Sequence, residues 1–148
     1  MIGLIIHTDG GSRGNPGEGA VGVVIETKDQ VIKGSNDQKG TILTEFGKAI
    51  GIVTNNEAEY QAVIYALEWV KNNITIKQYN NISFFMDSKL VCEQLNGRWK
   101  IKQDHLRKLF TEVKRLEVEI GVPVSYTHVL RDKNKRADEL LNQVLDTA

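Results

Sequence analysis

The sequence predicts an α/β domain built on a five-stranded mixed sheet, with three antiparallel strands followed by two parallel ones and helices on both faces. Three strand-like apolar stretches come first, which favours an antiparallel meander. Helix-like and strand-like stretches then alternate, which is typical of parallel crossover connections. With 148 residues, 41% of them hydrophobic, the chain is expected to form a single domain, residues 1–148.

The meandering strands are expected over residues 2–9, over residues 20–26 and from about residue 31. Both alternating sets of residues 2–9 are mostly apolar, as in a central strand covered on both faces. Residues 10–19 are predicted to form a loop, because glycines surround the turn sequence Asn15-Pro16-Gly17. Residues 42–53 resume the strand pattern, as a hairpin extension or a bulged third strand. The extra segment from Gly34 to Thr41 has no assigned role.

Four helices and two further strands follow, which gives the order β-β-β-α-β-α-α-β-α. The helices are expected at about residues 55–71, 88–95, 103–119 and 134–145, and the strands at 82–86 and 124–130. Asn55 or Asn56 is expected to cap the first helix and Ser88 the second, because their side-chain oxygens can accept hydrogen bonds from free backbone amides. Gly97 is expected to end the second helix.

Composition and charge exclude several classes of protein. The single cysteine, Cys92, excludes an internal disulfide and favours a reducing compartment. The apolar run at the N-terminus is too short for a signal peptide or a membrane span, so we expect a cytoplasmic protein that does not bind membranes. The net charge is zero, but residues 98–115 carry seven basic and two acidic side chains, a local charge of +5. This stretch is either a solvated helix face or a phosphate-binding strip.

Four acidic residues interrupt apolar patterns at the ends of predicted elements. Glu59 lies on the apolar stripe of the first helix, whereas Glu57 lies nearly opposite and should face water. Asp138 has the matching position on the last helix. Asp9 and Asp87 each follow an apolar strand, where α/β sheets commonly place their ligands. Each acid alone is more often a helix cap or an ion-pair partner, but four together indicate a site.

A divalent cation is the simplest occupant of such a site, because grouped carboxylates repel one another unless a positive charge lies between them. Three histidines and one cysteine argue against zinc, and His7 is interpreted as a packed strand residue. Oxygen ligands suit Mg²⁺, with Mn²⁺ as a substitute. Two ions bridged by carboxylates would suit in-line attack on a phosphodiester.

The sequence resembles type 1 ribonuclease H over nearly its whole length. The resemblance rests on four motifs in the right order, TDGGSRGNPG, TNNEAEYQAV, MDSKLV and HVLRDKNKRAD. It implies the ribonuclease H-like fold and hydrolysis of the RNA strand of RNA/DNA hybrids, with 3′-hydroxyl and 5′-phosphate products. The family's four metal-binding acids match Asp9, Glu59, Asp87 and Asp138. Its loop histidine, which helps the product leave or shuttles a proton, matches His128.

The resemblance also implies where an RNA/DNA hybrid would bind. Backbone groups of the glycine loop and nearby amide side chains would read the 2′-hydroxyl, and glycines would let the backbone approach the minor groove. Thr54 resembles a residue that holds a DNA-strand phosphate, and Asn134 matches an asparagine of the histidine loop. Substrate contacts are therefore expected at Gly10, Gly11, Ser12, Asn15, Thr54, Asn55, Asn56, Trp99, Lys100 and Asn134.

The chain departs from one branch of the family, which carries a long basic protrusion between the second and third helices. Only a short helix fits between Asp87 and Trp99. We interpret the RWKIK segment and the basic stretch as a partial replacement, so substrate binding is expected to be weaker and more salt-dependent. Trp99 is either a packing residue or a platform for a sugar or base.

Three functions stay open on the sequence alone. The first is a metal-dependent endonuclease acting on RNA/DNA hybrids, which we expect to be a monomer. The second is a related enzyme of the same fold: a nuclease that also cuts double-stranded RNA, a strand-transfer enzyme, or the ribonuclease H part of a reverse transcriptase. We expect that a chain running from Met1 to just past the last helix argues against the last of these. Asn15, Asn55 and Asn56 argue against a DNA-only enzyme. The third is a non-catalytic hybrid-binding module, which the presence of all four acids does not support.

Overall fold

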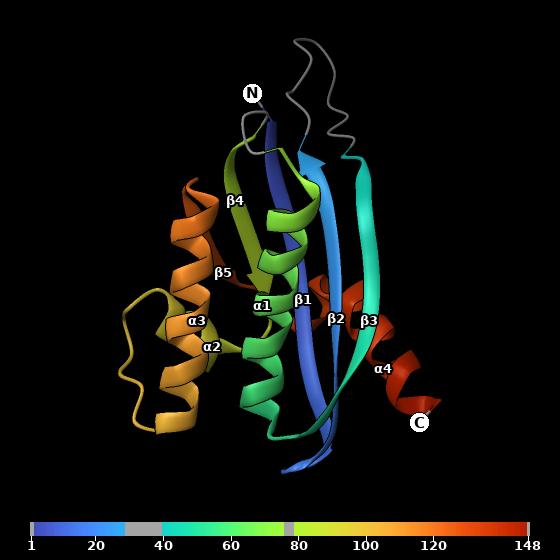
Figure 1. Cartoon of the computed structure of the whole chain (residues 1–148). Helices are drawn as coiled ribbons and strands as arrows, with labels where there is room; N and C mark the ends of the chain where they lie inside the picture. Colours follow the sequence, from blue (N-terminus) through green and yellow to red (C-terminus); the bar gives the residue numbers. More distant parts are fainter. Residues whose placement is uncertain (1, 29–39, 76–78, 148) are drawn as a thin grey trace.

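The computed structural model describes residues 2–28, 40–75 and 79–147 (Figure 1). In chain order the elements are β1 (Ile2–Gly14), β2 (Gly17–Lys28), β3 (Ile42–Val53), α1 (Asn55–Asn73), β4 (Tyr79–Met86), α2 (Lys89–Leu95), α3 (Asp104–Ile120), β5 (Val124–His128), the 3₁₀ turn η2 (Arg131–Lys133) and α4 (Lys135–Asp146). The predicted order of strands and helices is confirmed. The expected strand start near residue 31 and most of the segment from Gly34 to Thr41 lie outside the described residues.

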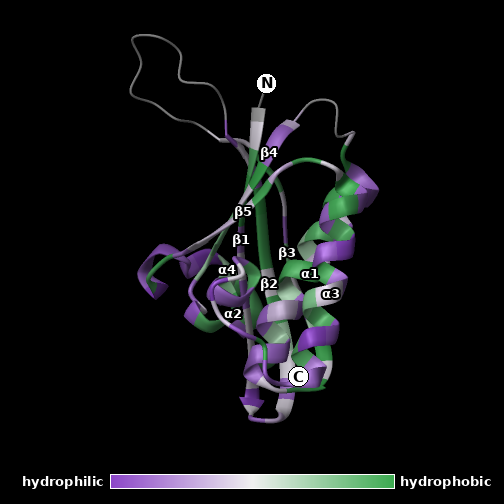
Figure 2. Cartoon of the chain, turned by 90° about the vertical axis from the view of Figure 1, so that its left-hand side faces the viewer, coloured by the Kyte–Doolittle hydropathy of each residue, from purple (hydrophilic) through white to green (hydrophobic). Residues whose placement is uncertain are grey.

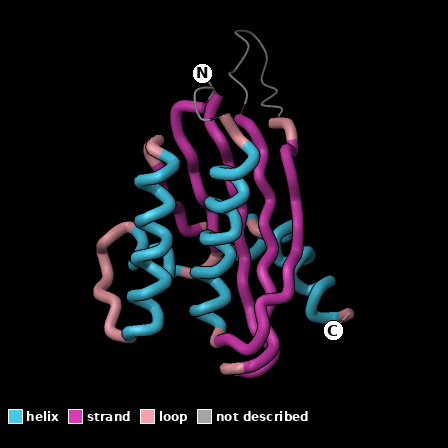
Figure 3. Tube along the Cα trace, in the orientation of Figure 1, coloured by secondary structure: helices cyan, strands magenta, loops and turns pink. Residues whose placement is uncertain are grey.

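The five strands form one mixed sheet in the order β3-β2-β1-β4-β5. β2 pairs antiparallel with β1 and β3, whereas β4 pairs parallel with β1 and β5. Figures 1 and 3 show α1 and α3 on one face of the sheet and α4 on the other. α1 packs on β1 and β2, α3 packs on α1, and α4 packs on β1, β2 and β3. The predicted fold class is therefore confirmed.

The main core fills the space between the sheet and the helices α1 and α3, where Figure 2 shows hydrophobic residues gathered. α1 is covered by the sheet on one side and by α3 on the other, so its buried residues extend well beyond the predicted stripe. A smaller cluster of Ala20, Leu141 and Leu145 lies under α4. Cys92 is buried in α2, as expected of a small core residue. Within the described residues, no helix is both long and apolar enough to cross a membrane.

The predicted loop over residues 10–19 is wrong. β1 continues to Gly14 and β2 begins at Gly17, so only Asn15 and Pro16, joined by a cis peptide bond, form the turn. The two strands pair with each other along this whole length, beyond the point where β4 ends. Pairing between the two strands stabilises the extended backbone despite the low strand propensity of glycine. A prediction from the local sequence sees only the glycines and therefore predicts a loop.

The first helix is capped by Thr54, not by Asn55 or Asn56. The Thr54 hydroxyl accepts a hydrogen bond from the backbone N–H of Glu57 at 3.2 Å, and the Glu57 carboxylate accepts one from the backbone N–H of Thr54 at 2.9 Å. This is a capping box, which the spacing T-x-x-E indicates. Glu57 is therefore half-buried and occupied by the cap, whereas we expected it to face water.

Candidate metal centre and nucleic-acid interface

The register of two parallel strands brings Asp9 and Asp87 together. Thr8 of β1 pairs with Met86, the last residue of β4, so the two aspartates are the next residues along neighbouring strands. Glu59 reaches the same point from α1. Helix α1 lies directly against the backbone of Gly10. A Cβ atom at this position would overlap the carbonyl group of Ala58, so only glycine allows this approach. Gly10 therefore sets how closely the helix bearing Glu59 approaches the strand bearing Asp9.

Asp9, Glu59 and Asp87 place carboxylate oxygens within 4.8 Å of one another. The residues Asp9 and Glu59 are only 5% and 9% exposed. Burial, followed by the charge of Asp87, raises the pKa of Asp9 to about 8. Burial, followed by the charge of Asp9, raises the pKa of Glu59 well above its ordinary value. Three crowded carboxylates of this kind are stabilised by a cation placed between them.

Asp138 forms part of the wall of the same cavity but lies outside the group of three. It stands in the first turn of α4, half-buried, and approaches Asp9 closely enough to raise the pKa of that residue. The cavity has a volume of 460 Å³. α4 comes this close because it lies on Gly22, the residue that pairs with Asp9 in β2, where a Cβ atom would overlap the carbonyl oxygen of Ala137.

The donor atoms of this group fit a hard divalent cation. Asp87 Oδ2 is buried and has no hydrogen-bond donor among the described residues. The Arg131 side chain, 85% exposed, places its Nε 3.7 Å from that oxygen. Carboxylate oxygens alone are the ligands preferred by ions such as Mg²⁺. The residues present therefore suit a divalent metal ion, which Asp9, Glu59 and Asp87 would hold.

A fixed network of amide side chains runs from the wall of the cavity to Asn15, which lies just outside it. Asn55 Oδ1 accepts hydrogen bonds from the backbone N–H of Ser12 at 3.0 Å and from its hydroxyl at 3.1 Å. Asn15 Oδ1 accepts one from the backbone N–H of Asn55 at 3.0 Å. Since a backbone N–H can only donate, these bonds orient both amides and direct their oxygens inward. Gly10, Gly11, Ser12, Asn55 and Asn56 line this cavity.

Thr54, Asn134 and His128, which we expected at the site, do not line the acidic cavity. Thr54 uses its hydroxyl to cap α1. Asn134 is 1% exposed and donates from Nδ2 to the carbonyl oxygen of Thr8 at 2.8 Å. His128 is exposed at the end of β5 and does not line the acidic cavity; its charge acts on Glu93 of α2. In its place Arg131 lines the cavity, a residue the motif HVLRDKNKRAD contains but that we assigned no role.

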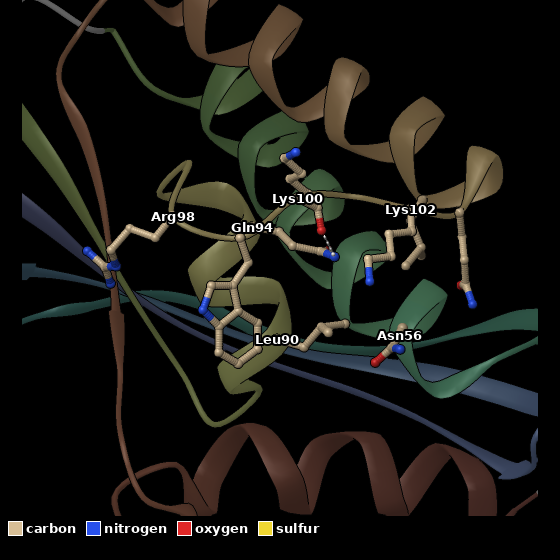
Figure 4. A pocket seen from close by; sticks show the side chains of 9 residues that line it. Asn56, Leu90, Gln94, Arg98, Lys100 and Lys102 are labelled. Atoms are coloured by element: carbon tan, nitrogen blue, oxygen red, sulfur yellow. Dashed lines mark hydrogen bonds between the residues drawn. The ribbon is translucent and has the colours of Figure 1, made fainter.

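A second cavity of 520 Å³ adjoins the first (Figure 4). Its wall combines the apolar residues Leu90, Trp99 and Leu106 with Lys100 and Lys102. Trp99 is 44% exposed, and the Lys89 ammonium lies 5.9 Å from the centre of its ring. Asn56 at the start of α1 lines both cavities, so the two adjoin at this residue.

The basic stretch 98–115 is largely neutralised by its neighbours. Ion pairs join Arg98 to Glu93, Arg107 to Asp104, Lys114 to Glu117, and Arg115 to both Glu112 and Glu119. Lys100, Lys102 and Lys108 have no carboxylate partner within the described part of the chain. Two of these three line the second cavity, so the remaining positive charge is concentrated there.

A sheet of this order, with acidic side chains gathered where β1, β4 and α1 meet, defines a ribonuclease H-like domain. The family model described as "Reverse transcriptase-like" matches residues 7–144. RNase H1 from Halobacterium salinarum superposes with a TM-score of 0.82 at 39% identity, covering 99% of both chains. LC11-RNase H1 in complex with an RNA/DNA hybrid gives a TM-score of 0.83 at 38% identity, covering 97% of both.

Curated sequences agree with these structural matches. Ribonuclease HI of H. salinarum is 41% identical over 143 residues, which are 96% of this chain and 64% of that protein. The bifunctional protein Rv2228c of Mycobacterium tuberculosis is 40% identical over 98% of this chain but only 36% of its own length. The chain therefore belongs to the reverse transcriptase-like family of ribonuclease H domains, and the two solved structures described above are RNase H1 proteins.

Proposed function

We propose that the chain is an endoribonuclease that hydrolyses the RNA strand of RNA/DNA hybrids and leaves 3′-hydroxyl and 5′-phosphate ends. The observation that carries this proposal is the group of three carboxylates within 4.8 Å beside an amide-lined wall. The similarity to LC11-RNase H1, a structure solved with an RNA/DNA hybrid, supports the choice of substrate.

Asp9, Glu59 and Asp87 hold divalent ions in this proposal, with Asp138 completing the set from the cavity wall. When bound, two Mg²⁺ ions, or Mn²⁺ in their place, would supply the positive charge that activates water and stabilises the leaving 3′-oxygen. The raised pKa values of Asp9 and Glu59 mean that protons leave as the metal binds. His128, exposed beside the site, is assigned to product release or proton transfer.

The two adjoining cavities suit the two strands of a hybrid. The RNA strand would lie over the acidic cavity, where the NH₂ groups of Asn15 and Asn55 can donate to acceptors in the minor groove, including the 2′-oxygen. The DNA strand would lie over the second cavity, with a sugar against Trp99 and phosphates near Lys100 and Lys102. A cytoplasmic monomer is part of the same proposal.

A duplex comparison tests the activity. Labelled RNA/DNA, RNA/RNA and DNA/DNA duplexes are incubated with the protein in Mg²⁺ and in chelator, and the product ends are identified by mass spectrometry. We expect Mg²⁺-dependent cutting of the hybrid alone. Cleavage of RNA/RNA at a similar rate would favour the double-stranded RNA alternative, and binding without cleavage would favour the non-catalytic module.

Two glutamates of one helix provide a matched pair of variants. Glu59→Gln should lower the cleavage rate at least about 10³-fold, because it removes charge from the metal centre. Glu57→Gln should cleave normally, because an amide oxygen can still accept from the backbone N–H of Thr54. Equal losses in the two variants would contradict the metal-site assignment.

A further inference from the structure

The segment 96–103 between α2 and α3 has no regular secondary structure, yet its backbone is held at several points. The Trp99 backbone N–H donates to the carbonyl of Glu93 at 3.2 Å. The Arg107 guanidinium donates from Nε to the carbonyl of Ile101 at 2.7 Å. These bonds come from α2 and α3, so the segment is fixed from both ends.

Gln94 holds the middle of this segment from inside the protein. It lies in α2 and is 4% exposed. Its Oε1 accepts a hydrogen bond from the buried Tyr60 hydroxyl at 2.7 Å, and its Nε2 donates to the carbonyl of Lys100 at 3.4 Å. A buried amide is costly unless it is hydrogen-bonded, and here both ends of the amide have partners.

These two bonds connect α1, the helix that carries Glu59, to the segment that lines the second cavity. Tyr60 follows Glu59 in α1, and Lys100 follows Trp99 in the segment. Figure 4 shows the Gln94 amide pointing to the carbonyl group of Lys100, whereas the Arg98 side chain points away from the cavity. The bonded chain Tyr60–Gln94–Lys100 therefore sets where the segment lies relative to the helix that carries Glu59.

We propose that Gln94 is a positioning residue for hybrid binding. It keeps residues 98–102 in one conformation, so that the DNA strand of the hybrid meets a surface that is already formed. Binding then loses no free energy to the ordering of a loop. Gln94 acts through the backbone of Lys100 and touches neither metal nor reacting atoms. This inference rests on the proposed function, because it assigns a role to the second cavity in binding the hybrid.

Gln94→Met is the decisive variant, because methionine fills a similar volume without hydrogen bonds. We expect the KM for a hybrid to rise about fivefold, as for the loss of one hydrogen bond, with kcat changed less than about twofold. The salt dependence of KM should stay the same, since no charge is removed. Gln143→Met, the same change at an exposed position of α4, is the matched control and should leave both constants unchanged.

Trp99 provides a readout that does not depend on activity. The chain has two tryptophans, so in a Trp69→Phe background the fluorescence reports on the segment alone. Acrylamide should quench Trp99 more strongly in Gln94→Met than in the parent. Tyr60→Phe, which keeps the bond to Lys100 but removes the other, should give intermediate quenching and an intermediate KM.

Unchanged quenching with an unchanged KM in Gln94→Met would overturn the proposal. A fall in kcat that follows a loss of thermal stability, at constant KM, would also overturn it and assign Gln94 to packing. Should the parent protein fail to cut or bind hybrids, the proposed function fails, whereas the quenching comparison still shows whether Gln94 fixes the segment.

Discussion

Asn134 and Thr8 join the two elements that carry Asp138 and Asp9. The buried Asn134 side chain, at the start of α4, donates to the carbonyl oxygen of Thr8 at 2.8 Å, one residue before Asp9. The position expected to contact substrate is thus inaccessible to any ligand in this structure. Its contact instead holds α4 against β1, which places Asp138 at the cavity wall.

Asn134→Ala should destabilise the protein by about 1–3 kcal/mol, because it leaves a buried carbonyl without its donor. The Mg²⁺ concentration for half-maximal cleavage should rise as Asp138 moves. Urea unfolding and metal titration measure the two effects, and Asn72→Ala, at an exposed position of α1, is the control. Unchanged stability with a raised KM would instead indicate a substrate contact.

The metal-free protein should lose stability as pH rises from about 4 towards 8. Folding raises the pKa of Asp9 to about 8, so in this range the unfolded chain has released a proton that the folded chain retains, and rising pH favours unfolding. Asp9→Asn removes this titration and should stabilise the metal-free protein at pH 8 by at least about 1 kcal/mol, since one pKa unit corresponds to ~1.4 kcal/mol. Thermal unfolding in chelator at several pH values measures the slope, and an equally steep decline in Asp9→Asn would contradict this reading.

Arg131→Gln should change metal and substrate binding in opposite directions. The exposed guanidinium lies beside Asp87, so its removal should tighten Mg²⁺ binding about twofold, as expected for a solvent-screened pair. Hybrid binding should weaken and its salt dependence should become shallower, because one phosphate-attracting charge is lost. Calorimetry with Mg²⁺ and anisotropy with a labelled hybrid at several salt concentrations test both signs. Weakening of both would show that Arg131 supports the fold of the site.

Gly22→Ala should be among the most damaging small substitutions. A Cβ atom there overlaps the carbonyl oxygen of Ala137, and the backbone of α4 cannot move aside without disturbing Asp138. We expect a loss of about 2 kcal/mol or more, together with weaker metal binding. Gly51→Ala is the matched control: it has open space but a φ of 80°, so it should cost about 1 kcal/mol and leave metal binding intact.

Local patterns predict all four acids, two from helical phase and two from strand ends, but they do not predict how close the side chains lie. Glu59 and Asp138 follow from the phase of apolar residues along their helices, and both line the cavity. The adjacency of Asp9 and Asp87 depends on strand register, which pairs residues far apart in sequence. The role expected of Asn134 comes from resemblance, which carries a residue type but not its burial or the direction of its side chain.

The glycines opposite α1 and α4 also bear on how the site tolerates change. Gly10 and Gly22 bring each helix against main chain, and peptide groups have the same dimensions whatever side chains surround them. Contacts between backbone atoms, rather than the packing of core side chains, therefore set the spacing between the elements that carry the carboxylates. Substitutions that repack the interior can accumulate over generations while the spacing needed for an ion stays constant.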